Sequence, residues 1–346
     1  MTKCLLLGAG ASFGHDEKLP YEQRPPLGHR LFSAGWESGL LKREDFASLL
    51  YQVCEYVGEV PDDIESGDML ECDAEMFLRD LHENHPTQQD NNSVNINTSV
   101  QESLGTCYYY FFELFRRYSA EFSPARDNYT KMIEKLDASD LHILSLNYDT
   151  LLEQSITFSG IDYSYFSSNF SKRNTIPVSK LHGSINWVNK FPAEAIYLGD
   201  SFADRIKMIH SNSMRLSGLK ILDLEKYSDI NYHELACGTR DTYEPALIPP
   251  FDSAKDYGKV DEYKVVWEIS KKMLGCSDEL VILGCGVKEN DSRLLTLLSN
   301  DLCDDTDITV VSGRQSEEIA NRLSKLTDAS SFNTDYRYFG DYVEAL

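Results

Sequence analysis

Short apolar runs alternate with amphipathic segments over much of the chain. Five of the runs are nearly continuous and have the length of buried strands; they lie at residues 3–7, 141–146, 176–181, 279–283 and 307–311. The amphipathic segments carry apolar residues at helical spacing; they lie at residues 150–156, 261–274, 292–298 and 315–326. Strands that alternate with helices predict an α/β fold, a Rossmann-like parallel sheet with helices on both faces.

Two long segments interrupt this alternation. From about residue 36 to 138 the pattern is helical only, with amphipathic stretches at 69–82, 103–118 and 127–136 and a polar, Asn-rich stretch at 86–101 that predicts a loop. The aromatic run Tyr108–Phe112 is expected to pack within its helix rather than stack on bases. The chain is therefore predicted as one α/β domain, residues 1–346, with a helical insertion at about 36–138 and a smaller irregular insertion at about 186–260.

The first strand runs directly into a glycine turn, whose residues are Gly8, Ala9, Gly10, Ala11 and Ser12. Glycines at this place allow a tight turn and let the backbone approach a pyrophosphate. The third glycine of the dinucleotide fingerprint is absent, because position 13 is a phenylalanine. Nucleotide binding and a plain strand-to-helix turn therefore both remain open for this segment.

Polar residues follow two further predicted strands. Asn147 and Asp149 come after the strand at 141–146, and His182 and Gly183 come after the strand at 176–181. In a parallel sheet, ligands bind beyond the carboxyl ends of the strands. A histidine there can act as a general base near neutral pH, and the glycine leaves room for a ligand. The structural alternatives are a turn or helix cap for Asp149 and a hydrogen-bonded loop histidine for His182.

A second glycine turn, containing Gly284 and Gly286, follows the strand at 279–283. Its backbone N–H groups are candidates for ribose or phosphate contacts. Asp291, five residues further on, either holds a ribose hydroxyl or caps the next helix.

Charge and cysteine content narrow the functional classes. A net charge of −23 disfavours direct binding of nucleic acid or of an anionic membrane surface. None of the eight cysteines belongs to a CxxC pair, so the sequence predicts no zinc site and indicates reduced thiols in a cytoplasmic protein. No apolar run reaches membrane-spanning length.

The ordered set of motifs resembles the sirtuin-like family. That family has a Gly-Ala-Gly-x-Ser turn, an Asn-x-Asp after a strand, a His-Gly and a late glycine turn, and this chain has them at Gly8–Ser12, Asn147–Asp149, His182–Gly183 and Gly284–Gly286. The resemblance spans residues 3 to about 311, and its specificity lies in the order and the strand-end placement.

Two departures decide which branch of the family is implied. The deacylases carry a four-cysteine zinc module after the His-Gly, whereas this chain has only Cys237 and Cys276 in that interval. The large helical insertion before Asn147 is unlike the deacylases. With this insertion the chain instead resembles bacterial sirtuin-like proteins that consume NAD+ in anti-phage defence. The resemblance also implies a homo-oligomer and a second protein, such as an ATPase or a phage-sensing module.

On this basis the chain is predicted to be an NAD+ glycohydrolase that takes NAD+ as its substrate. His182 is the expected general base, and Asn147 is expected to hold a ribose hydroxyl or the attacking water. The remaining predicted NAD+ contacts are Gly8–Ser12, Asp149, Gly183, Gly284, Gly286 and Asp291. The alternatives are an NAD-dependent protein deacylase, a non-catalytic NAD or ADP-ribose sensor in a larger assembly, and a structural scaffold.

Overall fold

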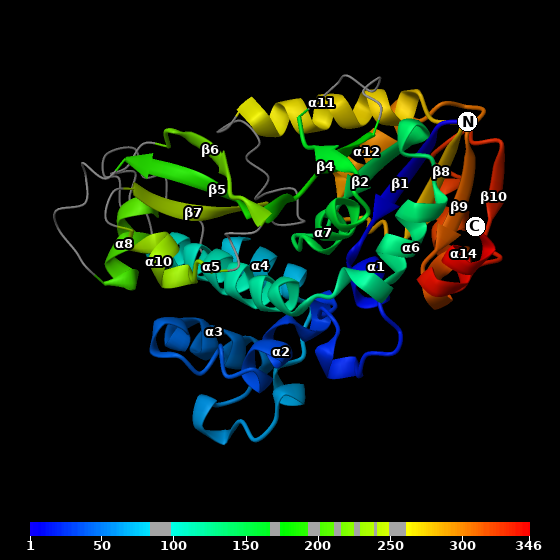
Figure 1. The fold of residues 1–346 in the computed structure, drawn as a ribbon. Coiled ribbons are helices and arrows are strands. Elements are labelled where there is room, and N and C mark those ends of the chain that lie inside the picture. Colours follow the sequence, from blue (N-terminus) through cyan, green and yellow to red (C-terminus); the bar gives the residue numbers. More distant parts are fainter. Residues whose placement is uncertain are drawn as a thin grey trace, which may run out of the picture. The chain divides into compact units, whose positions relative to one another are not determined.

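The computed structural model describes residues 1–83, 98–166, 174–192, 201–210, 216–224, 229–238, 241–248 and 261–346. The chain forms two compact units. Unit 1 consists of Met1–Pro25, Glu121–Gly183 and Pro250–Leu346, and unit 2 consists of Pro26–Ala120 and Ser184–Pro249. Figure 1 shows the path of the chain through the elements of both units.

Unit 1 is built on a seven-stranded sheet with the order β10-β9-β8-β1-β2-β4-β3, in which every neighbouring pair is parallel. The strands are β1 Lys3–Leu7, β2 Leu141–Ser145, β3 Asp162–Ser164, β4 Thr175–Lys180, β8 Glu279–Leu283, β9 Asp307–Val311 and β10 Ser331–Asn333. The central strands β8, β1 and β2 are mostly aliphatic and mostly buried, as expected for a sheet covered on both faces. The strand-rich pattern of the sequence arises from this sheet.

Helices flank the sheet of unit 1, and the predicted α/β, Rossmann-like fold is confirmed. They are α1 Ala9–Phe13, α6 Asn128–Lys135, α7 Leu151–Phe158, α11 Asp261–Gly275, α12 Ser292–Asp301, α13 Ser316–Leu323 and α14 Phe339–Ala345. Helix α6 packs against α7 and α14, and α11 packs against α12 (Figure 1). Asp127 is the N-cap of helix α6, and its carboxylate accepts hydrogen bonds from the backbone N–H groups of Tyr129 and Thr130.

Unit 2 combines helices with a small sheet of order β6-β5-β7. Its elements are α2 Leu31–Glu37, α3 Ala47–Val57, α4 Ala74–Glu83, α5 Thr98–Glu121, α8 Phe202–His210, α10 Tyr232–Ala236, β5 Gly183–Pro192, β6 Gly218–Ile221 and β7 Asp241–Leu247. Its core is aromatic: the Tyr110 ring is stacked on Phe32 and meets Phe46 edge-on. The run at 108–112 is thus helix packing, as predicted.

Short 3-10 turns connect these elements, at Tyr21–Gln23, Gly28–Arg30, Glu44–Phe46, Pro61–Asp63, Gly67–Leu70, Pro124–Arg126, Ala138–Asp140 and Gly313–Gln315. One of them corrects the sequence analysis. The helix predicted over 69–82 begins only at Ala74, because Gly67–Leu70 forms a separate 3-10 turn and the Asp73 carboxylate accepts hydrogen bonds from the first turn of α4.

The predicted loop at 86–101 is partly wrong, since residues 98–101 belong to α5, and residues 86–97 lie outside the described residues.

The bounds of the two predicted insertions differ from those of unit 2. Unit 2 takes in most of both segments, but it starts at Pro26 and ends its first part at Ala120, so α6 belongs to unit 1. The division into one domain with insertions remains a prediction.

Candidate active site

The carboxyl ends of the central strands of unit 1 lie in one row. The last residues of β4, β2, β1 and β8 are aligned by register, as Lys180, Ser145, Leu7 and Leu283. The hydrogen-bond ladder continues past them, because Leu146 N donates to the Leu7 carbonyl and Leu181 N donates to the Ser145 carbonyl. The predicted residues that follow these strands therefore stand side by side along one edge.

This edge is also a topological switch point. From β1 the chain continues to β2 on one side, and it later returns to β8 on the other side of β1. In open parallel sheets, a crevice outside the carboxyl ends at such a point is the usual place for a ligand.

The two glycine turns pack directly against each other. Gly8 N donates to the Leu283 carbonyl over 2.9 Å, and Gly10 N donates to the Gly284 carbonyl over 2.8 Å. A Cβ on Gly8 would lie 2.6 Å from Cys285 Cα, and a Cβ on Gly284 would lie 2.1 Å from Ala11 N. Gly284 also has a φ of +59°, which favours glycine. The structure thus supplies a packing reason for these glycines, in addition to the tight turn and the approach of a ligand that the sequence suggested.

Several backbone donors of the first turn are already in use. The N–H groups of Gly8, Gly10 and Ala11 all donate to protein carbonyls. A pyrophosphate over this turn, which stays a prediction, would have to bind through other groups. Gly286 in the second turn is more open, since a Cβ there would meet only Lys288 Cγ, at 3.7 Å.

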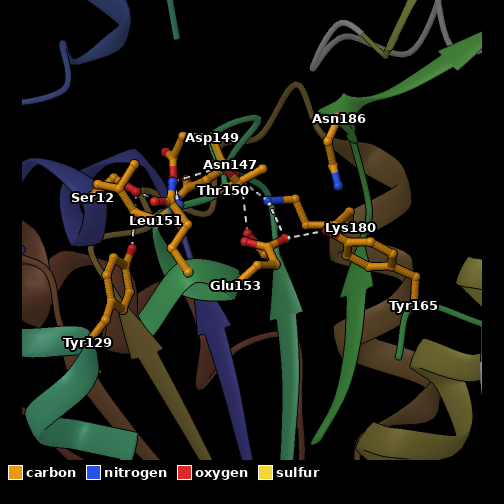
Figure 2. Close-up of polar contacts among 12 residues, drawn as sticks. Ser12, Tyr129, Asn147, Asp149, Thr150, Leu151, Glu153, Tyr165, Lys180 and Asn186 are labelled. Carbon is orange, nitrogen blue, oxygen red and sulfur yellow. Dashed lines mark hydrogen bonds and ion pairs between the residues drawn. The ribbon is translucent and has the colours of Figure 1, made fainter. Parts of the chain in front are cut away.

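Asn147 is buried, 7% exposed, and is fixed by the first turn (Figure 2). Its amide nitrogen donates to the Gly8 carbonyl over 2.9 Å and to Ser12 Oγ over 3.0 Å. Ser12 Oγ in turn lies 3.0 Å from the Tyr129 hydroxyl. Because both amide hydrogens are used within the protein, the side-chain oxygen of Asn147 is the polar atom that these contacts leave for a ligand.

Asp149 takes part in the turn that begins α7. Its carboxylate accepts a hydrogen bond from Leu151 N over 3.2 Å, which is the turn role weighed in the sequence analysis. Its backbone carbonyl accepts a hydrogen bond from Lys180 Nζ over 2.6 Å. Strand β4 therefore holds the Asn147–Asp149 segment from the neighbouring position in the sheet.

A buried charged group that the sequence pattern did not predict lies beside this turn. Lys180 Nζ forms an ion pair with Glu153 Oε1 over 3.2 Å, and the Tyr165 hydroxyl donates to the same oxygen over 3.0 Å (Figure 2). Lys180 and Glu153 are 1% and 0% exposed. The other Glu153 oxygen has no hydrogen-bond partner among the described residues. A lysine that ends an apolar strand was the signal that could have identified this group.

His182 pairs with Asp291. His182 Nε2 lies 3.0 Å from Asp291 Oδ2, and both residues are 4% exposed. The second carboxylate oxygen of Asp291 accepts a hydrogen bond from Leu294 N over 3.1 Å and so caps α12. The adjacent Gly183 has a φ of +79°, a left-handed conformation that turns the chain sharply after the histidine.

Burial sets the electrostatics around these residues. Burial raises the pKa of Tyr129 well above its usual range, so the tyrosine stays neutral against Ser12. Burial likewise lowers the pKa of His15, with the nearby Asp149 charge acting in the opposite direction. Burial raises the pKa of Asp127 to about 6, with hydrogen bonds from Thr130 opposing the shift.

No group of three or more His, Cys, Asp or Glu side chains suited to a metal ion occurs in the described ranges. None of the eight cysteines, all of which lie in the described ranges, forms a disulfide. No helix in the part of the chain that the structure describes is long and apolar enough to cross a bilayer.

One segment of the chain is similar to a known protein family. Residues 141–218 match the family model of a SIR2-like domain, and no curated protein matches the chain. The matched segment contains Asn147, Asp149, Lys180 and His182, whereas both glycine turns and Asp291 lie outside it. The match supports a sirtuin-like family and an NAD-related function in the broad sense.

Proposed function

We propose that this protein is an NAD+ glycohydrolase that splits NAD+ into nicotinamide and ADP-ribose. The observation that carries the proposal is that Asn147 and His182 follow the ends of the neighbouring strands β2 and β4, that both are buried, and that both lie inside the SIR2-like match. The carboxyl edge of a parallel sheet is the usual place for a ligand. A buried amide there can hydrogen-bond a polar ligand, and a buried imidazole can take a proton during its reaction.

The proposed reaction breaks the bond between the nicotinamide nitrogen and C1′ of the ribose. Nicotinamide leaves with the electron pair of that bond, and the positive charge spreads over C1′ and the ring oxygen, as in glycoside hydrolysis. A water oxygen then bonds to C1′, and the proton that the water loses passes through His182 to solvent. The products are ADP-ribose, nicotinamide and one proton, so atoms and charge balance.

Each residue has a distinct part in this proposal. Asn147 presents its side-chain oxygen to a ribose hydroxyl or to the attacking water, because Gly8 and Ser12 hold its amide nitrogen. His182 takes the proton, a contribution that is typically about 10²–10⁴-fold in rate. The ribose and pyrophosphate are proposed to extend toward the two glycine turns, Gly8–Ser12 and Gly284–Gly286.

The biological setting is part of the proposal. Unrestrained loss of NAD+ would harm the cell, so the activity is proposed to be gated. A cytoplasmic, oligomeric effector of bacterial anti-phage defence, acting with a partner ATPase or a phage-sensing protein, fits this requirement and rests on the resemblance alone.

The test is NAD+ consumption by the purified protein, with products separated by chromatography, beside His182→Ala. His233, an exposed histidine on α10 in unit 2, offers the matched control His233→Ala. We expect nicotinamide release by the wild type and by His233→Ala, and a loss of at least about 10²-fold in His182→Ala. Full turnover in His182→Ala would contradict the assigned role.

A wild type that turns over no NAD+ still separates the alternatives through binding. Calorimetric binding of NAD+ or ADP-ribose without turnover would favour the sensor or a gated enzyme, and transfer of an acyl group from acyl-lysine peptides would favour the deacylase. Absence of any binding would refute the nucleotide site.

A further inference from the structure

We infer that Asp291 is a positioning residue, which holds the His182 imidazole in the tautomer that carries its proton on Nε2 and leaves Nδ1 free to accept one. The inference deepens the proposed function and rests on it. It gives Asp291 a role other than the predicted contact to a ribose hydroxyl.

The contact itself is specific. Asp291 Oδ2 lies 3.0 Å from His182 Nε2, and the two side chains are 6% and 5% exposed. A carboxylate can only accept a hydrogen bond, so the nitrogen facing it must carry the proton. No hydrogen bond joins His182 Nδ1 to the residues that the structure describes. In the neutral imidazole, Nδ1 is then the acceptor and the base.

Several contacts hold the connection in which Asp291 lies. The Asp291 side chain caps α12 through Leu294 N, so one oxygen fixes the carboxylate while the other faces the histidine. Earlier in the same connection, Val287 is buried and has a φ of +43°, which a β-branched residue adopts only when its surroundings impose it. Its carbonyl accepts a hydrogen bond from Arg322 Nη1 over 2.6 Å.

The pair also ties distant parts of the sheet together. His182 follows β4 and Asp291 follows β8, and β1 and β2 lie between these strands in the sheet order. The pair therefore belongs to the same carboxyl edge as Asn147, where the proposed reaction takes place. An imidazole on a loop has a free choice of ring orientation and tautomer, and a fixed carboxylate removes that choice.

The chemistry follows from this arrangement. Water gives its proton to Nδ1 as its oxygen bonds to C1′, and the imidazolium that forms keeps its Nε2–H directed at the Asp291 carboxylate. Asp291 accepts no proton; it orients the ring and stabilises the imidazolium, which is the role of the carboxylate in the Ser-His-Asp arrangement. Nicotinamide departs with the electron pair, and the Nδ1 proton is released to solvent.

Two variants separate this role from helix capping. Asp291→Asn and Asp291→Ser both keep a side-chain oxygen suited to an N-cap. The amide that Asp291→Asn introduces can offer an N–H to Nε2 and so favours the opposite tautomer, whereas the serine side chain of the other variant is too short to reach the ring. Thermal unfolding of both variants shows whether the cap is intact, with an expected change in midpoint of only a few degrees.

The decisive experiment is nitrogen-15 NMR of histidine-labelled full-length protein, with the His182 signals assigned through His182→Gln. We expect the Nε2–H tautomer in the wild type and its loss in both Asp291 variants. In an active wild type, kcat should fall by roughly 10²–10⁴-fold in Asp291→Asn while KM changes little.

Other results overturn the inference. An Nδ1–H tautomer in the wild type, or a tautomer that is the same in all three proteins, excludes the positioning role. A raised KM with unchanged kcat would instead return Asp291 to the ribose contact. Because the NMR result does not require NAD+ turnover, the inference can fail or hold separately from the proposed function.

Discussion

The two units contain different sets of buried polar groups. In unit 1, polar residues at or just after strand ends bond to side chains of the neighbouring helices, as Asn147 does with Ser12 of α1 and Lys180 does with Glu153 of α7. In unit 2, two buried tyrosines lie inside an aromatic core and bond to backbone carbonyls: the hydroxyls of Tyr109 and Tyr110 donate to the carbonyls of Tyr243 and Leu31.

Both arrangements obey the rule that a buried polar group needs a partner, but their consequences differ. A tyrosine that uses its only proton on a carbonyl fastens two segments and leaves nothing for a ligand. A row of amide, ammonium, carboxylate and imidazole groups at a sheet edge offers more hydrogen-bond donors and acceptors than the contacts within the protein use. We therefore expect mutations in unit 1 to affect activity and stability together, and mutations in the core of unit 2 to affect stability alone.

The largest effect is expected from Lys180→Met, which removes one member of the buried ion pair with Glu153. The variant leaves an uncompensated buried carboxylate and should lower the free energy of unfolding by about 3–5 kcal/mol. It also frees the Asp149 carbonyl, so NAD+ turnover by the remaining folded protein should fall. Urea denaturation and a turnover assay below the unfolding midpoint measure the two effects.

Unit 2 supplies the control for this prediction. Glu113 is 2% exposed and pairs with both Arg116 and Arg117. Arg116→Met leaves the second arginine in place, so we expect a loss of only about 1 kcal/mol and unchanged turnover. Equal losses in Lys180→Met and Arg116→Met would remove the contrast between the two units.

A smaller effect is expected from a matched pair of hydroxyl deletions. Tyr110→Phe removes the hydrogen bond to the Leu31 carbonyl, and Tyr129→Phe removes the contact to Ser12 Oγ. Each should cost about 1–2 kcal/mol of stability. Only Tyr129→Phe should reduce NAD+ turnover, by several-fold, because Ser12 also holds Asn147. Equal losses of turnover in the two variants would contradict the role of Tyr129 and Ser12 in holding Asn147.

The smallest effect concerns two buried carboxyl groups, one in each unit. Burial raises the pKa of Asp127 in unit 1 to about 6, so its contribution to stability is complete below its unfolded value of 3.8 and is lost as pH rises through about 6. From pH 7 to pH 5 the wild type should therefore gain about 1 kcal/mol relative to Asp127→Asn. Chemical denaturation at the two pH values measures this difference.

Glu113 in unit 2 should behave in the opposite way. Burial acts to raise its pKa, but hydrogen bonds and charge from Arg116 and Arg117 bring it below 4.5. Its contribution to stability is present above 4.5 and is lost as pH falls through the lowered value. Glu113→Gln should thus destabilise most near neutral pH. A stability difference that is independent of pH for both carboxyl groups would contradict these assignments.

Much of unit 1 could be predicted from local pattern. The buried strands at β1, β2, β4, β8 and β9 were found within about one residue, because apolar runs of strand length are a local signal. The edge strands β3 and β10 were missed, since each has only three residues and carries no such run. The secondary structure of segment 186–260 could not be predicted from its pattern either. This segment contributes to the β6-β5-β7 sheet, in which β5 and β6 are antiparallel.

The sequence by itself determined the order of the strands along the chain and the polar residues that follow them, because periodicity and strand-end placement are properties of neighbouring residues. It named Asn147, His182 and Asp291 as residues of interest. Only the tertiary structure decided their partners. Asn147 meets Gly8 across 139 residues and His182 meets Asp291 across 109, and no local signal encodes contacts over such separations. The same holds for Lys180. The charge of this residue at the end of an apolar strand is explained only by the tertiary structure, in which Glu153 of α7 forms an ion pair with it.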